Sequence, residues 1–298
     1  KDASEFTLVL ALNGVAHPTG YPLYTLLGHA FVRALHALGA PWAWAANAWS
    51  AAGGALAVFF LHALAARLVP AASRLGRRGR CLVALSPVVL FAFDPMWTME
   101  TTLAEVYSWH LAWVCGAALF FLASLRGLAA EAVPPRRSSR RRALGWGLVC
   151  GLGLAHHLTS VLVSVPLSIG LAFAARRRRQ LRTADVALAL LAACVPLLSY
   201  GVIAYRAFHP TLVQWAVLGP SWSRVLAHVT GQQYRVFLGE FRPSEEQQRY
   251  LALYVYPLLF PALAGLVAAA WRAREPAARH ALWAMAAAAG MGSLYAFG

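Results

Sequence analysis

The side chains that could carry out chemistry in this chain begin with two carboxylates, Asp2 and Glu5, placed three positions apart. They are followed by residues 13–24, in which His17 and Tyr21 each precede a proline. A residue before proline is driven out of helical conformation, so this segment should form a bent and fairly rigid connection. The arrangement suggests a reaction centre at a membrane surface. The alternative is that the carboxylates are solvated and the prolines only separate two helices.

A second polar grouping surrounds Glu105, which lies one helical turn before Ser108 and Trp109 at the mouth of an apolar segment. An ionisable residue at that depth in a membrane is costly, which favours a functional role. A helix N-terminus also favours glutamate through the helix dipole, so a purely structural role is the alternative.

A third grouping contains the adjacent histidines His156 and His157, where two short apolar segments meet. Neighbouring residues point to different sides of a helix, so the two imidazoles are poor joint ligands for a metal ion, and no other metal-binding spacing accompanies them. They could contact a ligand, or they could make structural hydrogen bonds.

The segment 206–250 adds aromatic, amide and guanidinium groups, among them Trp222, Tyr234 and Arg235. Such groups are suited to binding a sugar or a phosphate. An amphipathic helix at the membrane interface would show the same residue types, and for any single residue here that is the alternative.

The composition limits the class of protein to which these groups belong. Of the 298 residues, 60% are apolar and 12% are charged, a balance that is unusual for a water-soluble domain. The net charge of +15 comes from clusters of arginine between apolar stretches, which is the positive-inside pattern of a membrane protein and not a nucleic-acid-binding surface. The cysteines lie inside apolar segments without the spacing of a zinc site or a disulfide framework: Cys81, Cys115, Cys150 and Cys194.

The apolar stretches predict an all-α, polytopic bundle of transmembrane helices. Spans of about 20 residues are needed to cross a bilayer. The fourth and fifth candidates are short and meet at the two histidines, so we expect a tight helical hairpin or helices broken at a cavity there. The candidate spans are residues 43–66, 81–98, 106–125, 143–157, 158–175, 183–205, 251–271 and 281–298.

Charge predicts which side of the membrane each loop faces. Four loops that fall on one side carry 19 of the 26 basic residues, and this side should be cytoplasmic: 67–80, 126–142, 176–182 and 272–279. The opposite side then holds Asp2, Glu5, Glu105 and the 206–250 loop. This assignment requires that residues 21–39 lie on the surface as an interfacial helix. If they crossed the membrane, Asp2 and Glu5 would move to the cytoplasmic side.

We therefore expect one transmembrane domain over residues 1–298. It would begin with an external catalytic loop and an interfacial helix (1–42), followed by transmembrane helices (43–205). An external loop (206–250) and further transmembrane helices (251–298) would complete it. The chain begins without methionine and stops within an apolar run, so we expect further segments at both ends.

Several of these segments together resemble the bacterial relatives of a family of transmembrane O-mannosyltransferases that modify IPT domains, formerly known as DUF2723 and built on the GT-C glycosyltransferase fold. Thr19 departs from the family pattern, where a second proline is expected, so the loop should be slightly less stiff. The segments are Asp2-x-x-Glu5, Gly14 to Tyr24, Asn47 with Ser50-Ala51, Ala104 to Tyr107, Gly153 to Thr159 and His228 to Arg235.

The resemblance implies a multi-pass glycosyltransferase that moves a mannose-like sugar from a polyprenyl-phosphate donor to an acceptor hydroxyl outside the cytoplasm. It also implies inversion of configuration at the sugar. The acceptor would be a protein, a glycan or a lipid, no cofactor is expected, and a bacterial enzyme would lie in the inner membrane with its site facing the periplasm. Asp2 would be the general base. Glu5 is the second catalytic candidate, and either Glu5 or Glu105 would hold sugar or acceptor hydroxyls. The expected substrate-binding residues are His17, Tyr21, Glu105, His156, His157, Arg206, Tyr234 and Arg235, with the two arginines facing the leaving phosphate.

Two other classes of function fit the same residues. A transporter or flippase for a lipid-linked or small polar substrate would line its pathway with the intramembrane histidines and glutamates. The two halves of the chain show no convincing internal repeat, which disfavours this class. In a non-catalytic scaffold the polar groups would only form hydrogen bonds with the unpaired backbone groups at the ends of helices.

Overall fold

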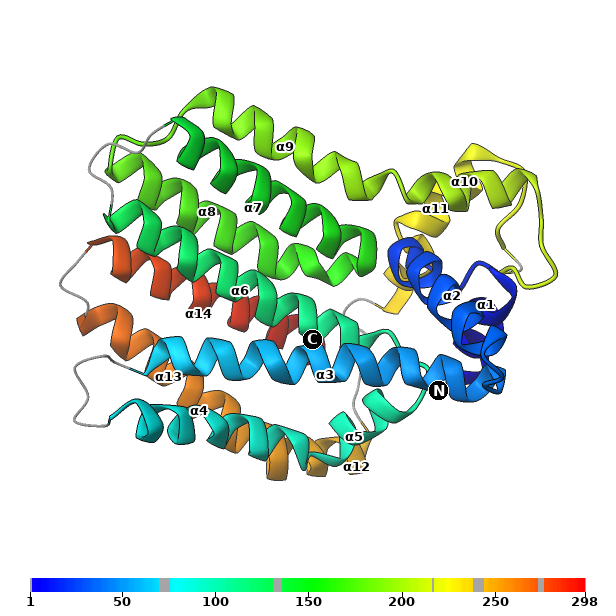
Figure 1. Cartoon of the computed structure of the whole chain (residues 1–298), viewed down its shortest axis with the longest axis horizontal. Coiled ribbons are helices and arrows are strands. Elements are labelled where there is room, and N and C mark those ends of the chain that lie inside the picture. Colours follow the sequence, from blue (N-terminus) through cyan, green and yellow to red (C-terminus); the bar gives the residue numbers. More distant parts are fainter. Residues whose placement is uncertain are drawn as a thin grey trace. The chain divides into compact units, whose positions relative to one another are not determined.

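Helices make up nearly all of the secondary structure in the computed structural model (Figure 1), which describes residues 2–69, 76–130, 136–215, 217–237, 244–272 and 276–297. Within these ranges, the β-structure is one isolated parallel bridge between Val15 and Gln214. The helices are α1 (Ala3–Leu12), α2 (Pro22–Ala37), α3 (Trp42–Leu68), α4 (Arg77–Ala92), α5 (Pro95–Thr102), α6 (Tyr107–Ala130), α7 (Arg136–His156), η1 (Leu158–Ser160), α8 (Val161–Arg177), α9 (Thr183–Leu197), α10 (Tyr200–Phe208), α11 (Trp222–Val229), η2 (Gln232–Phe237), α12 (Glu245–Tyr250), η3 (Leu251–Val255), α13 (Tyr256–Arg272) and α14 (Pro276–Phe297).

The chain divides into two units. Unit 1 contains Lys1–Phe120, Leu152–Leu158 and Pro196–Gly231. Unit 2 contains Phe121–Gly151, Thr159–Val195 and Gln232–Gly298. The helices α6, α7 and α9 each contribute residues to both units.

Four helical segments in the described ranges are long and apolar enough to cross a membrane: Trp42–Leu68, Tyr107–Ala130, Leu158–Arg177 and Thr183–Phe208. They agree with four of the predicted spans, and the expectation of an all-α, polytopic helical protein is confirmed. Leu158–Arg177, which we expected to be short, has the length of a full span.

The predicted span at 81–98 is not one straight helix. It consists of α4 and α5, which are bent by 75° at a short break. The break follows from local chemistry: the Asp94 carboxylate accepts a hydrogen bond from the Trp97 N–H at 3.0 Å, and Pro95 occupies the first helical position. A side-chain N-cap followed by proline starts a new helix, so the chain changes direction there.

The remaining predicted spans correspond to less regular elements. The 143–157 segment is the second part of α7, which begins with a cluster of arginines, so the helix as a whole is too charged to count among the spans. The 251–271 segment contains η3 and α13, of which Leu259–Arg272 is a shorter apolar helix, and the 281–298 segment contains the shorter apolar stretch Leu282–Met291.

Unit 1 has its main core where α1, α2 and α3 pack against one another. Helix α2 has 16 residues, fewer than the roughly 20 needed to cross a bilayer. Its placement at the membrane interface stays a prediction. The buried side chains of this core come from the three helices, the loop after α1 and the segment before α6: Phe6, Val9, Leu10, Ala16, Tyr21, Tyr24, Val32, Ala45, Ala46, Trp49, Ala104 and Val106.

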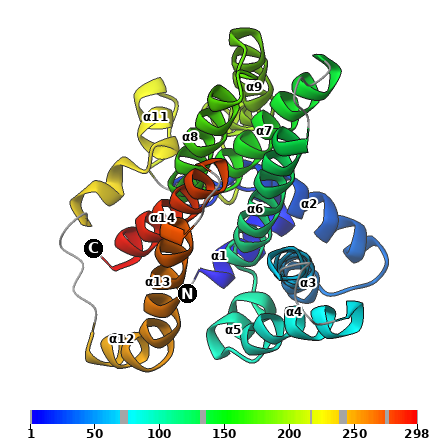
Figure 2. The same cartoon turned by 90° about the vertical axis from the view of Figure 1, so that its left-hand side faces the viewer.

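In unit 2, α14 packs against both α8 and α13 (Figures 1 and 2). Helices α7 and α9 approach so closely that a Cβ atom at Gly147 or Gly151 would overlap the backbone carbonyl of Ala189 or Ala193, respectively. Small residues four positions apart on each helix permit this backbone contact, which is the usual way in which helices associate inside a membrane.

We expect Gly147→Ala to destabilise unit 2 by about 1–3 kcal/mol, because the added methyl group must push α9 away from α7. A thermal unfolding curve of the detergent-solubilised protein checks this. The matched control is Gly265→Ala in α13, where no atom lies within 4 Å of the added Cβ atom. The control should unfold at the wild-type temperature or slightly above it, because alanine favours helix. Equal melting temperatures for both variants would contradict the close contact.

Candidate functional site

Helix α1 presents the two N-terminal carboxylates. Its buried face consists of Phe6, Val9 and Leu10, which pack into the core of unit 1. This packing leaves Asp2, at the N-cap, with a side chain that is 59% exposed, whereas the Glu5 side chain is 25% exposed. The first turn of α1 therefore carries one open carboxylate and one that is largely covered.

The loop that follows α1 is held firmly. Residues 14–22 are all buried, as expected for a stiff connection. The Val15 N–H donates a hydrogen bond to the Val213 carbonyl at 3.0 Å, and the Gly20 N–H donates to the His17 carbonyl at 2.8 Å. The first bond, together with the bridge to Gln214, anchors the loop to the segment between α10 and α11, and the second closes a turn within the loop.

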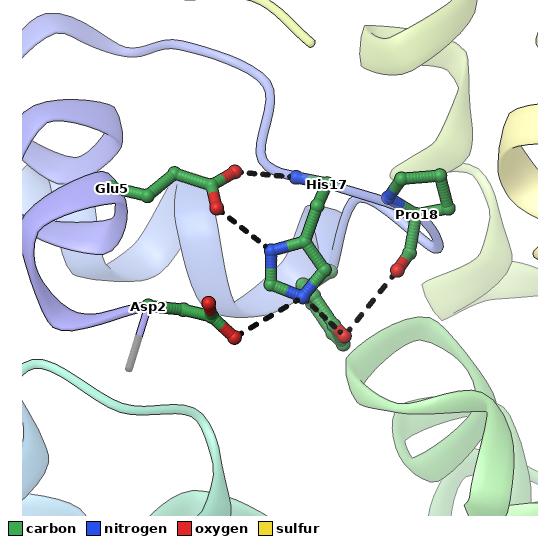
Figure 3. A network of polar contacts seen from close by, with 5 residues as sticks. Asp2, Glu5, His17 and Pro18 are labelled. Carbon is green, nitrogen blue, oxygen red and sulfur yellow. Dashed lines mark hydrogen bonds and ion pairs between the residues drawn. The ribbon is translucent and has the colours of Figure 1, made fainter. Parts of the chain in front are cut away.

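His17 is the centre of the polar contacts in this loop (Figure 3). Glu5 accepts two hydrogen bonds from it, one from the backbone N–H at 2.6 Å and one from the ring Nδ1 at 2.9 Å. The other ring nitrogen, Nε2, lies 3.0 Å from the Tyr21 hydroxyl and 4.0 Å from a carboxylate oxygen of Asp2. The structure thus brings together four of the residues that the sequence singled out.

These contacts change the ionisation of both partners. Burial alone would raise the pKa of Glu5, but the hydrogen bonds from the His17 ring and backbone outweigh it, so the pKa falls below the ordinary 4.5. Burial alone would lower the pKa of His17, but the hydrogen bond and charge of Glu5, with smaller contributions from Asp2 and Glu105, raise it above the ordinary 6.5. Glu5 and His17 consequently favour an ion pair.

The rings of the two adjacent histidines share one neighbour, His110 of α6, and differ in their other neighbours. The His157 ring lies 5.3 Å from the Tyr21 ring and 5.9 Å from the Tyr107 ring, measured between centroids. The His156 ring is buried, 6.0 Å from the Tyr24 ring. His157 thus joins the ring cluster around His17 through Tyr21.

Glu105 is buried just before α6. The Ser50 hydroxyl from α3 bonds to its backbone, where the Glu105 N–H donates and the Glu105 carbonyl accepts, each at 2.9 Å. These bonds fix the position of the residue, and its negative charge is felt at His17.

One buried histidine near this cluster begins the segment 228–235 that carries part of the family resemblance, but no individual role was expected for it. His228, from α11, lies against Gly20, where the backbone φ is +82° and a Cβ atom would come 3.1 Å from the His228 Nε2. Burial is the main reason that the pKa of His228 is lowered to about 4, so this ring is neutral at pH 7. Its place depends on how α11 packs against the loop, which residue spacing does not show.

Three further binding residues were expected: Arg206, Tyr234 and Arg235. The Arg206 guanidinium is 6.0 Å from the centre of its neighbouring Tyr205 ring, and among the described residues no ion pair joins it to Asp2 or Glu5. Tyr234 is exposed and belongs to unit 2. The side chain of Arg235 lies outside the described residues. A role for these three residues in phosphate or sugar binding stays a prediction.

The geometry provides an open carboxylate that is backed by a covered acid–imidazole pair and by aromatic rings. An exposed carboxylate can accept a proton from a hydroxyl, and aromatic faces beside it can pack against a sugar ring. The arrangement suits chemistry on a hydroxyl-bearing substrate.

The shifted pKa values predict how the contribution of this pair to stability depends on pH. The lowered pKa of Glu5 stabilises the fold above pH 4.5, and this contribution is lost as the pH falls through the pKa of Glu5 in the folded protein. The raised pKa of His17 stabilises the fold below pH 6.5, and this contribution is lost as the pH rises through the pKa of His17 in the folded protein. We expect Glu5→Gln to cost about 1.5–3 kcal/mol between pH 4.5 and 6.5, and less on either side. Thermal melts of wild type and variant across this range test the expectation, and a pH-independent difference would contradict it.

Comparisons with known proteins identify one curated relative. The relative "Protein O-mannosyl-transferase tmem260" from Dictyostelium discoideum is 28% identical over 185 residues. The aligned region covers 59% of this chain and 21% of the relative, so the chain spans about a fifth of the length of that protein. No solved structure matches the chain.

A family match covers the polar cluster itself. Residues 2–181 match the family described as "Protein O-mannosyl-transferase TMEM260 N-terminal domain". This range contains Asp2, Glu5, His17 and both adjacent histidines, whereas Arg206 and the 228–235 segment lie beyond it. Because the match extends over more than half of the chain, and because the long apolar helices are those of an integral membrane protein, the chain belongs to the TMEM260 N-terminal domain family.

Proposed function

We propose that this protein is a membrane glycosyltransferase that moves a mannose-like sugar to an acceptor hydroxyl. The observation that carries the proposal is the open carboxylate of Asp2, which is 59% exposed and lies within the region matched by a family of O-mannosyl-transferases. The name of the Dictyostelium relative, a protein O-mannosyl-transferase, supports a protein as the acceptor. We propose a polyprenyl-phosphate sugar as the donor, since an enzyme of the GT-C type draws its sugar from a lipid carrier.

In the proposed reaction, Asp2 accepts the proton of the acceptor hydroxyl while the hydroxyl oxygen bonds to C1 of the sugar. The bond between C1 and the phosphate oxygen breaks, and its electron pair leaves with the polyprenyl phosphate. A single displacement of this kind inverts the configuration at C1. Asp2 is favoured over Glu5 for the proton transfer because both oxygens of Glu5 contact His17.

The neighbouring groups have complementary roles in this proposal. His157 and Tyr107, which lies at the start of α6 and is 51% exposed, offer ring faces to a sugar. His17, Tyr21 and His156 shape the side of the site that faces α1 and α2. Arg206 and Arg235 neutralise the charge on the departing phosphate, and Glu105 and Tyr234 complete the expected substrate contacts.

We further propose that Asp2 faces the non-cytoplasmic side, where a bacterial inner membrane meets the periplasm. The support is the distribution of charge, because the four loops that carry most of the arginines alternate with the segments that carry the polar cluster. A lipid-linked donor made at the cytoplasmic face would then be used on the opposite face.

We expect Asp2→Asn to lower transfer by about 10² to 10⁴-fold, because the amide cannot accept the hydroxyl proton. The full-length protein is given polyprenyl-phosphate mannose and acceptor proteins, and the glycosylated product is quantified. Asp94→Asn is the matched control, since asparagine keeps the N-cap of α5. Equal product from wild type and Asp2→Asn would remove Asp2 as the base. Movement of the lipid-linked sugar across vesicles without any glycosylated product would instead favour a transporter.

The sidedness is tested with a single cysteine. In a variant whose four native cysteines are replaced, Ser138→Cys places a thiol in the arginine-rich start of α7. We expect this thiol to resist a membrane-impermeant maleimide in intact cells and to react after the membrane is permeabilised. Labelling of intact cells at residue 138 would reverse the proposed orientation.

A further inference from the structure

The carboxylates of Asp2 and Glu5 contact different nitrogens of the same imidazole ring (Figure 3). Glu5 holds the backbone and Nδ1 of His17, so the ring cannot rotate without breaking a hydrogen bond. Since a carboxylate only accepts hydrogen bonds, Nδ1 carries a proton. The orientation of Nε2 is thereby fixed toward Asp2 and Tyr21.

Exposure separates the roles of these three residues. The side chain of Asp2 is 59% exposed, that of Glu5 is 25% exposed and that of His17 is 11% exposed. A substrate hydroxyl can reach Asp2 directly, whereas His17 is covered and its Nε2 already lies 3.0 Å from the Tyr21 hydroxyl. Glu5 and His17 therefore stand behind the open carboxylate and do not themselves offer an open position to a substrate.

We infer that Glu5 and His17 form a positioning pair for Asp2, in which Glu5 orients the ring and the His17 imidazolium holds the Asp2 carboxylate toward the acceptor hydroxyl. The inference rests on the proposed transferase function and deepens it, because it assigns Glu5 and His17 to the control of the base and not to sugar binding. The proposed arrangement follows a general rule, which is that a reacting group needs supporting hydrogen bonds behind it to hold its geometry.

The charged state of His17 follows from the groups that face it. Asp2 and Glu5 of α1 and Glu105 before α6 are carboxylates that favour the imidazolium. His157 and His228 also face the ring, from the end of α7 and from α11, and their charges would oppose it. The Tyr21 hydroxyl, on the loop itself, can accept a hydrogen bond from the Nε2 N–H because it donates its own hydrogen to the Pro18 carbonyl at 3.5 Å.

The ionisation of His17 can be measured without any assay of transfer. The full-length protein is prepared with ¹⁵N-labelled histidine, and His17→Gln identifies the signal of residue 17 by its loss. In the wild type we expect this signal to titrate above the ordinary pKa of 6.5. In Glu5→Gln the midpoint should fall by about 1 pH unit, because one contacting carboxylate is removed. Asp2→Asn should lower it as well, by less.

Asp94→Asn is again the control, because it removes a carboxylate that caps α5 and should leave the His17 midpoint unchanged. Asp2→Asn keeps the test valid if Glu5→Gln misfolds, because Asp2 is exposed and its substitution leaves the core intact. A His17 midpoint that is the same in wild type, Glu5→Gln and Asp2→Asn would overturn the positioning pair, whether or not the protein transfers a sugar.

Transfer kinetics provide the second readout. If the imidazolium positions the base, activity falls as the pH rises through the His17 pKa. In Glu5→Gln we expect kcat to drop on the order of 10²-fold with little change in KM, and the alkaline limb of the pH profile to move to lower pH. A drop in activity with an unmoved alkaline limb would show a structural role only and would overturn the inference. Absence of transfer in the wild type would count against the proposed function. The titration of His17 would still show whether the carboxylates of Glu5 and Asp2 act on the His17 ring.

Discussion

The hydrogen bonds between Glu5 and His17 are the contacts on which the arrangement of unit 1 around α1 depends. They join two residues that lie twelve positions apart and so tie the first turn of α1 to the loop that follows it. The same loop is bound at Val15 to residue 213, and α11 packs against it through His228. A charge-assisted pair at this point is stronger than a neutral hydrogen bond, and it fixes the direction of a helix that is only ten residues long.

The site follows the usual division between covered and open polar groups. A buried ionised group is costly unless it is paired, and Glu5 and His17 satisfy each other. Asp2 avoids this cost because it remains exposed. The covered pair supplies ordered surroundings, and the exposed carboxylate beside it is accessible to a substrate. The site needs both kinds of group, because one residue cannot be covered and open at once.

The sequence was sufficient to predict a helical membrane protein and its family, because both depend on patterns that are local in the chain. Apolar runs and arginine clusters mark the spans, and Asp2, His17 and the adjacent histidines fall in short motifs. The bend at Asp94 was also encoded locally, by an N-cap followed by Pro95, but hydropathy alone merged α4 and α5 into one span. The partnership of Glu5 with His17 and the approach of His228 could not be predicted, since they depend on how α1, the loop and α11 pack.

The polar cluster lies in one part of the chain, and several of its supports lie in another. The region that matches the family ends at residue 181 and contains the carboxylates, His17 and both adjacent histidines. Besides Glu5, the loop has supports from beyond this region: the carbonyl of Val213, the bridge to Gln214 and the ring of His228. Because a reacting group must be held within a fraction of an ångström, the residues that carry the chemistry and the residues that hold them are both needed. The family region therefore supplies the side chains of this site and part of their support, while segments beyond residue 181 supply the rest.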